Sequence, residues 1–236
     1  MHPIERLRAV ARAREVDQAV LAREAASVLG AFAGDPLGLV TACRRLLDRH
    51  PTAATLWWTF ARLLDTADVR AEAQAVRRDL DDAPAVSALA LDLPDRVVVA
   101  LVPDVAGGSE LAMDLLAERD DMVIAHDPGA LHVERDEPRI LLVEAGAAGP
   151  DRFLAPAGAE DEIEAARDAG VAVWLVVDVG RRLPKPLFEA LVRRAPAGCE
   201  QLAPALAERV VEPRRVACPV PPELLRPPAP GDPGAR

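Results

Sequence analysis

The stretch Arg96-Val97-Val98-Val99-Ala100-Leu101-Val102 decides the fold of this chain. A continuous run of Val, Ala and Leu is typical of a strand whose two faces are both covered, as in a parallel sheet. Similar apolar runs recur downstream, at residues 122–125, 140–143 and 171–177. Residues 109–119 and 159–169 lie between these runs and have helical spacing. This alternation predicts an α/β domain with a Rossmann-like, doubly wound parallel sheet.

Residues 4–82, upstream of this domain, show a helical pattern. Apolar residues recur there at three- and four-residue spacing, as in Leu37, Val40, Cys43 and Leu47. The sequence therefore predicts an N-terminal helical bundle. Cys43 belongs to the apolar stripe of its helix, so we expect a buried structural thiol.

Glycines, prolines and capping residues mark the expected ends of these helices. Gly30 and Gly34 are expected to end a first long helix, and Asp35-Pro36 supplies an N-cap followed by Pro at the first helical position. The next helix is expected to begin at His50-Pro51-Thr52, and Thr66 to cap a fourth.

The composition changes twice along the chain, which predicts three parts. These are an N-terminal helical domain at 1–85, a Rossmann-like α/β domain at 90–211 and a Pro-rich C-terminal tail at 212–236. Prolines crowd the third part, which neither a helix nor a central strand tolerates. We expect a flexible terminus there; the alternative is an extended segment that binds an adaptor domain.

Charge and composition exclude several classes of protein. The formal net charge of -10 argues against a nucleic-acid partner, because phosphate contacts need an excess of Lys and Arg. The longest apolar run, residues 171–177, is too short to span a bilayer, so we expect no membrane partner and a cytoplasmic location. Cys43, Cys199 and Cys218 lack the spacing of a zinc site or a disulfide framework, and we expect neither a metal nor a cofactor.

Two stretches resemble a known family. His50-Pro51-Thr52-Ala53-Ala54-Thr55-Leu56-Trp57-Trp58 is similar to the Arg-Pro-Thr-Ala-Val-Asn-Leu segment and following aromatic of the initiation factor 2B family, which also contains sugar-phosphate isomerases. Residues 140–191 resemble the same family in the order of strand, Ala/Gly loop, helix and strand. Asp35-Pro36, the string at 49–52 and Phe153-Leu154-Ala155-Pro156-Ala157-Gly158 are similar to actinobacterial members. The resemblance implies the same two-part fold and a homodimer formed through the α/β domain.

The isomerase residues that the resemblance implies are missing from this sequence. The loop after the first strand, Pro103-Asp104-Val105-Ala106-Gly107-Gly108, carries no cysteine, and Gly146 stands where these isomerases have an aspartate. Ala155-Pro156 replaces their Asn-Lys pair, and only Gly158 of that motif remains. Because isomerisation needs an acid and a base, we assign no catalytic residue.

Three places on the chain are candidates for contact with an anion. Gly107, Gly108 and Ser109 follow the first strand, where backbone amides can face an anion; the alternative is a simple strand-to-helix turn. Gly158 precedes the helix at 159–169. Arg181 and Arg182 follow the strand at 171–177, in a loop that is either a phosphate contact, a basic surface loop or an oligomer contact.

Glu144 ends the strand that begins at Ile140 and is expected at the crevice where such sheets bind ligands. A solvated carboxylate, or a structural bridge to Arg181 or Arg182, explains it as well. The favoured function is a non-catalytic ligand-binding or regulatory module that binds a phosphorylated small molecule. The alternative is a sugar-phosphate isomerase or related sugar-phosphate or nucleotide enzyme that uses Glu144 with His126 or Asp178.

Overall fold

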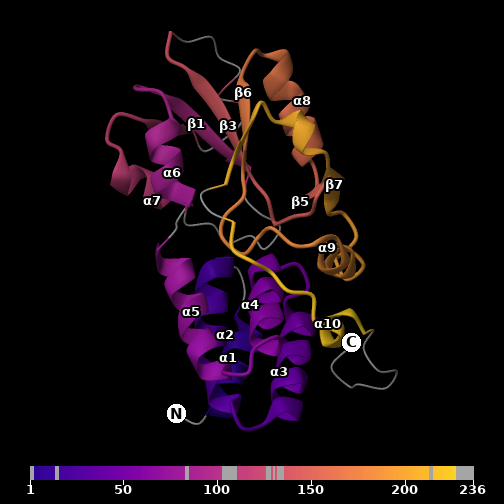
Figure 1. Ribbon diagram of the computed structural model, residues 1–236. Coiled ribbons are helices and arrows are strands. Elements are labelled where there is room, and N and C mark those ends of the chain that lie inside the picture. The colour runs from indigo at the N-terminus through magenta and orange to yellow at the C-terminus, as the bar shows by residue number, and fades with distance from the viewer. Residues whose placement is uncertain are drawn as a thin grey trace.

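The protein consists of a helical domain and an α/β domain, which lie one above the other in Figure 1. The computed structural model describes residues 3–13, 16–82, 85–102, 111–125, 129, 131, 136–212 and 215–226. The helical domain contains α1 (Pro3–Arg12), α2 (Gln18–Leu29), a short 3-10 helix (Gly30–Phe32), α3 (Pro36–Arg49), α4 (Ala54–Leu64) and α5 (Val69–Asp82). The α/β fold class predicted from the sequence is confirmed.

Capping side chains explain where these helices begin. The carboxylate of Asp35 accepts a hydrogen bond from the Gly38 N–H at 2.9 Å, as the Asp35-Pro36 pair predicts. The prediction of one long first helix was wrong: the Asp17 carboxylate accepts from the Ala19 N–H at 2.7 Å and starts α2 separately. Asp68, not Thr66, caps α5, since its carboxylate accepts from the Ala71 N–H.

Helix α4 forms the centre of the helical domain. Every residue from Ala54 to Ala61 is buried, and Trp57, Trp58 and Phe60 are completely so. The same hydrophobic cluster includes Val179, Leu183 and Leu187 of the α/β domain. The cores of the two domains are therefore continuous.

The α/β domain is built on a five-stranded sheet in the order β2-β1-β3-β6-β8, and every pairing in it is parallel. The strands are β1 (Val98–Val102), β2 (Val123–Ala125), β3 (Arg139–Glu144), β6 (Ala172–Val176) and β8 (Arg209–Val211). Helices α6 (Ala85–Asp92) and α7 (Leu111–Glu118) pack on one face, and α8 (Ala159–Asp168) packs on the other. Both faces are covered, which explains the continuous apolar strands.

A smaller antiparallel sheet, β4-β5-β7, lies beside α8 and α9 (Lys185–Val192) (Figure 1). Its strands are β4 (Ala147–Ala148), β5 (Phe153–Ala155) and β7 (Glu200–Leu202), and a 3-10 helix follows at Pro204–Leu206. The chain then crosses to the helical domain, where α10 (Pro222–Leu225) packs against α4 and α9. The expectation that the Pro-rich part holds no helix was wrong, because Pro222 stands at the first helical position, where proline is tolerated. Leu224 is buried there, and the Arg44 guanidinium donates two hydrogen bonds to the Glu223 carbonyl. Within the described part of the chain, no helix is long and apolar enough to cross a membrane.

Candidate functional site

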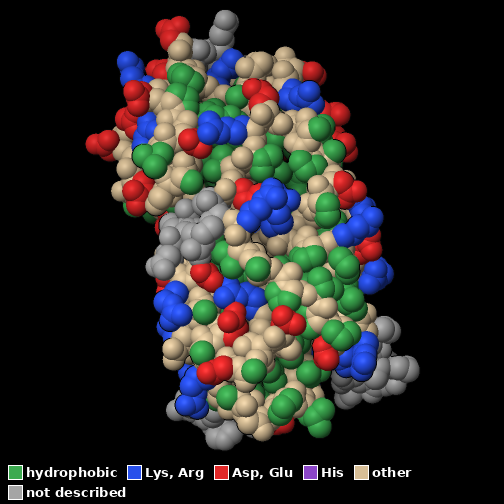
Figure 2. Space-filling view, viewed as in Figure 1, with side chains coloured by type: hydrophobic (Ala, Val, Ile, Leu, Met, Phe, Trp, Pro, Cys, Tyr) green, Lys and Arg blue, Asp and Glu red, His purple; other side chains and the backbone are tan. Residues whose placement is uncertain are grey.

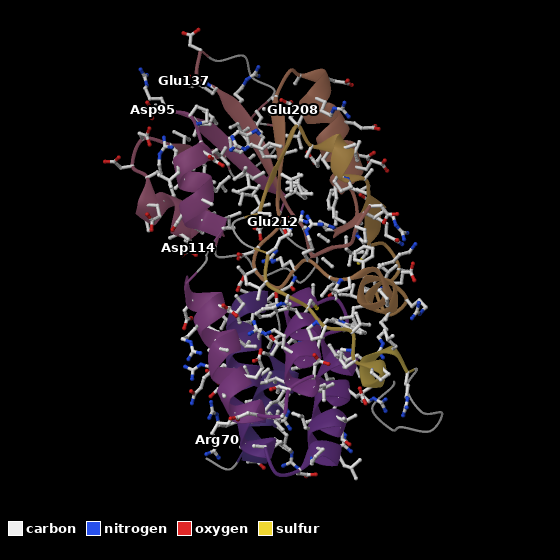
Figure 3. The ribbon with its side chains drawn as sticks, in the orientation of Figure 1. Arg70, Asp95, Asp114, Glu137, Glu208 and Glu212 are labelled. Carbon is white, nitrogen blue, oxygen red and sulfur yellow. The ribbon has the colours of Figure 1, made fainter. Side chains whose placement is uncertain are left out.

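The carboxyl ends of the parallel strands face the helical domain. Figure 3 shows Glu137 and Glu208, which precede β3 and β8, at the far end of the sheet, and Glu212, which follows β8, toward the helical domain. Among the parallel strands the order reverses between β1 and β3, and sheets of this kind bind ligands in the crevice at that reversal. The crevice between the two domains is therefore where a site is expected.

Some residues that the sequence analysis assigns to this crevice lie in segments outside the described residues. The loop after β1, which carries Gly107, Gly108 and Ser109, is one such segment. His126, which follows β2, lies in another. The geometry of the crevice is therefore built from the loops that follow β3, β6 and β8, together with the helical domain.

Glu144 and Arg181 meet in this crevice. The Arg181 Nη1 atom lies 3.3 Å from Glu144 Oε2 and donates to the Ala145 carbonyl at 3.1 Å. Arg181 Nη2 lies 3.6 Å from Asp17 Oδ2, so a carboxylate of the helical domain approaches the same guanidinium. Glu144 is 3% exposed and Arg181 4% exposed. We call these three residues the Glu144–Arg181–Asp17 cluster; Glu144 ends β3, and Arg181 lies in the loop after β6.

Gln18 joins the helical domain to the same place. Its Nε2 donates to the Gly146 carbonyl at 3.0 Å, and its Oε1 accepts from the Thr55 N–H at 3.3 Å. Gln18 is completely buried. Because a buried amide that loses its partners costs free energy, these bonds fix the loop after β3 against α2 and α4.

Arg182 lies in a separate cleft of about 430 Å³, which we call the Arg182 cleft. Its Nε is 2.7 Å from Glu212 Oε1, and its Nη1 donates to the Gly149 carbonyl at 2.9 Å. The other oxygen of Glu212 lies 3.1 Å from Arg215 Nε. One carboxylate therefore bridges two arginines that line this cleft. Figure 2 shows Lys and Arg side chains gathered where the two domains meet on this face.

Asp178 also lines the Arg182 cleft. Its carboxylate accepts from the Val179 N–H at 2.7 Å and from the Ala85 N–H at 3.2 Å. Burial raises the pKa of the Asp178 carboxyl above its ordinary value, while the charge of Arg181 opposes the shift. Burial therefore makes protonation of Asp178 easier than in an exposed aspartate.

Comparison with solved structures identifies the fold. The chain matches the tetrameric eIF2B-beta2-delta2 complex from C. thermophilum with a TM-score of 0.61 and 15% identity, covering 89% of this chain and 88% of that one. It matches 5-methylthioribose 1-phosphate isomerase from Pyrococcus horikoshii OT3 with a TM-score of 0.60 and 12% identity, covering 94% and 85%. The chain has the initiation factor 2B fold. The translation initiation factor eIF-2B of Pyrococcus horikoshii OT3 matches with a TM-score of 0.56 and 15% identity, covering 76% and 79%. Neither a protein-family model nor a curated protein sequence matches.

At Gly146 and Ala155, two positions where the resemblance implies isomerase residues, the chain makes backbone hydrogen bonds. The Gly146 N–H donates to the Leu154 carbonyl at 2.8 Å, while its own carbonyl accepts from Gln18. Ala155 is completely buried in β5, where it pairs with Glu200. Neither position offers a side chain that can transfer a proton.

Gly158 lies apart from the crevice. It is the N-cap of α8 with a φ of 85°, a conformation that favours glycine. Its N–H donates to Glu200 Oε1 at 2.6 Å, and the Glu160 N–H donates to the other oxygen of Glu200 at 2.8 Å. The N–H groups at the start of α8 therefore already bind a carboxylate of the chain, that of Glu200. Glu144 and Arg181 are brought together by the fold; no hydrogen bond among the described residues connects Gly158 to either.

Three residues of the site escape the sequence analysis: Asp17, Gln18 and Glu212. Asp17 carries a local signal, because an Asp before an apolar helical run is typical of an N-cap, but the signal does not predict its contact with Arg181. Glu212 follows β8, a three-residue strand that the sequence pattern does not predict. Among the described residues, no group of His, Cys, Asp and Glu is arranged to hold a metal ion.

Proposed function

We propose that this chain is a non-catalytic ligand-binding or regulatory module with the initiation factor 2B fold. The observation that carries the proposal is the Glu144–Arg181–Asp17 cluster, in which a carboxylate at the end of β3 already pairs with a buried guanidinium of the chain itself. A substrate that contacts Glu144 there would have to disrupt its buried ion pair with Arg181, which costs several kcal/mol. The cluster therefore favours a structural role for Glu144 over proton transfer.

The absent isomerase residues support the same proposal. Isomerisation of a sugar phosphate needs an acid and a base on the two sides of the carbon chain. Gly146, Ala155 and Pro156 stand where the resemblance expects the aspartate and the Asn-Lys pair. The chemistry of the isomerases would therefore need other residues.

The proposed ligand is a phosphorylated small molecule, and the Arg182 cleft is its proposed site. The Arg182 side chain is 26% exposed and that of Arg215 is 73% exposed, so both guanidinium groups are accessible from solvent. Arginine binds phosphate through two parallel hydrogen bonds, and a phosphate would compete with Glu212 for both. The loop with Gly107, Gly108 and Ser109 remains a proposed second contact.

The proposed assembly is a homodimer formed through the α/β domain, in the cytoplasm. Apolar side chains on this domain support it: Met113 is 70% exposed, Leu116 44% and Val123, on the edge strand β2, 57%. The eIF2B-beta2-delta2 complex from C. thermophilum, whose fold this chain shares, is tetrameric. Sedimentation equilibrium measures the mass in solution, and a monomer at micromolar concentration would contradict the homodimer.

A thermal-shift titration tests the ligand-binding proposal. The probes are ribose 5-phosphate, 5-methylthioribose 1-phosphate and AMP, because a ligand that binds the native state raises the melting temperature. We expect one probe to stabilise the wild type and the control Arg78→Ala, whose side chain is exposed and far in sequence from the cleft, but to stabilise Arg182→Ala much less. An equal shift in Arg182→Ala would remove Arg182 from the site. No shift with any probe would contradict phosphate binding and favour a protein-interaction role.

One observation favours the alternative of a sugar-phosphate enzyme. Asp178, whose pKa is raised by burial, shares the Arg182 cleft with a cation that can hold phosphate. Phosphorus and carbon NMR of 5-methylthioribose 1-phosphate incubated with the protein would detect conversion. Turnover that disappears in Asp178→Asn would establish the enzyme and overturn the non-catalytic proposal.

A further inference from the structure

The part of the chain that follows β8 leaves the α/β domain and crosses to the helical domain, as the yellow trace in Figure 1 shows. Its described residues are 212 and 215–226, which we call the C-terminal strap. Glu212, Arg215, Val216 and Cys218 of the strap line the Arg182 cleft. The strap therefore forms one wall of that cleft, and its position determines how accessible Arg182 is.

Glu212 attaches the strap to the α/β domain. Its Oε1 atom lies 2.7 Å from Arg182 Nε, and its Oε2 atom lies 3.1 Å from Arg215 Nε. The Glu212 side chain is 11% exposed. A carboxylate that binds guanidinium groups through both oxygens forms the same charge-assisted hydrogen bonds as a phosphate does. An anion that reaches Arg182 Nε must therefore displace Glu212, which is a competitor built into the chain.

The short helix α10 attaches the other end of the strap to the helical domain. Leu224 is 1% exposed and belongs to the hydrophobic cluster of that domain. The Arg44 guanidinium donates to the Glu223 carbonyl from Nε at 3.1 Å and from Nη2 at 2.8 Å. The strap is thus anchored near both of its ends, to one domain at each.

The backbone between these two anchors has no regular structure. Residues 215–221 form neither helix nor strand. Pro219 and Pro221 have no backbone N–H to donate. Segments of this kind near a terminus open locally at a much smaller free-energy cost than unfolding of the whole domain. Loss of the Glu212 anchor should therefore loosen the strap while both domains stay folded.

We propose that the C-terminal strap is autoinhibitory: Glu212 occupies Arg182, and an anion that binds Arg182 in the cleft releases the strap. The inference rests on the proposed function, which takes the Arg182 cleft as the phosphate site. A phosphate at Arg182 would lie beside the largely buried carboxylate of Glu212, and like charges repel more strongly where water is excluded. Because anion binding favours the open strap, an open strap must raise the affinity for the anion by the same factor.

The rate at which Cys218 reacts with dithionitrobenzoate measures opening of the strap in the full chain. Burial raises the pKa of the Cys218 thiol to about 12, so the closed strap holds it in the unreactive thiol form. Cys199→Ser provides the background, which leaves Cys43, completely buried in α3, as the internal reporter of global unfolding.

In this background we expect Glu212→Gln to speed the labelling of Cys218 about tenfold, because a charge-assisted hydrogen bond is weakened. Glu208→Gln is the matched control: Glu208 is exposed and precedes β8, at the far end of the sheet from Glu212 (Figure 3). An unchanged rate in Glu212→Gln would show that Glu212 does not hold the strap. Labelling of Cys43 at the same rate as Cys218 would show unfolding of the whole protein and refute local release.

Isothermal titration calorimetry with ribose 5-phosphate as the probe tests the link between the strap and the anion. We expect Glu212→Gln to bind about tenfold more tightly than the wild type and Glu208→Gln to bind as the wild type does. Adding ribose 5-phosphate to the wild-type background should also speed the labelling of Cys218.

The results separate this inference from the proposed function. Equal affinity in Glu212→Gln and the wild type would overturn autoinhibition but leave the Arg182 cleft as a phosphate site. Slower labelling of Cys218 with ribose 5-phosphate would mean that the strap closes over the anion, which is the opposite of release. Absence of binding in both proteins would refute the phosphate site itself, and with it the inference.

Discussion

The arginine of the Glu144–Arg181–Asp17 cluster and two arginines on the surface of the helical domain, Arg12 and Arg49, have opposite environments. In the cluster, the buried guanidinium of Arg181 faces carboxylates from two domains. On the helical domain, Arg12 and Arg49 are exposed and have no carboxylate partner among the described residues. Burying a charge is costly unless a counter-charge is supplied, whereas an exposed cation needs none. The first arrangement therefore depends on its ion pairs for stability, and the second does not.

The largest expected loss of stability comes from removing the buried arginine, Arg181. Arg181→Ala removes the guanidinium group that faces both Glu144 and Asp17, and removing one partner of a buried ion pair costs about 3–5 kcal/mol. Urea unfolding measures the change in the free energy of unfolding. The matched control is Arg12→Ala, which should stay within about 0.5 kcal/mol of the wild type because its side chain is exposed. If Arg181→Ala and Arg12→Ala lowered the free energy of unfolding by similar amounts, the buried ion pairs of Arg181 would not be what stabilises the fold.

A smaller loss of stability is expected from a substitution at Gly180, where the α/β domain packs against α4 of the helical domain. Gly180 has a φ of 78°, and a Cβ added there would lie 2.9 Å from Thr55 Cγ2 and 3.0 Å from the Trp58 ring. Gly180→Ala should lose about 1–3 kcal/mol from backbone strain and more from crowding. Gly170→Ala provides the control, because Gly170 has a φ of 67° but nothing within 4 Å of the added carbon.

The difference between these two variants in urea unfolding isolates the crowding at the domain contact. Gly180→Ala should be the less stable of the two. Equal losses would show that the helical domain gives way around Gly180, and the contact between the domains would then be looser than the packing of Trp58 indicates.

The smallest expected effect is the pH dependence that Asp178 contributes. Burial raises its pKa, so the folded protein binds this proton more readily than the unfolded chain does. The stability it contributes is therefore fully present below the unfolded pKa of about 3.9 and is lost as the pH rises through the folded pKa. Asp178→Asn removes this dependence. Urea unfolding from pH 4 to pH 7 should show the free energy of unfolding of the variant rising relative to that of the wild type; a constant or falling difference would contradict the raised pKa.

The sequence predicts those parts of the fold in which the local pattern and the tertiary environment agree. Strands β1, β3 and β6 are covered on both faces, so their apolar runs are unbroken and their prediction is confirmed. Strand β8 is only three residues long and has exposed Arg209 and Val210, so its pattern resembles a loop. The division of the first helix is missed because the apolar spacing continues on both sides of Asp17.

The candidate site is predictable only in part, because half of it comes from the other domain. Glu144 and Arg181 follow neighbouring parallel strands, whose carboxyl ends meet at one edge of the sheet, so their meeting is expected. Asp17 caps α2, and Gln18 is the first residue of that helix. The contacts of α2 with the carboxyl edge of the sheet depend on how the two domains dock. Gln18 and Gly146 are 128 residues apart, and no local pattern connects them.

The bond between Arg44 and Glu223 also sets an order of events during synthesis of the chain. The two residues are 179 positions apart, and Glu223 emerges from the ribosome long after the helices it covers. At roughly 5–20 residues per second, about ten to forty seconds separate their appearance. Throughout that interval the α3 and α4 surface that α10 later covers is open to chaperones and to nascent neighbours, so its final closure is a late, C-terminal step.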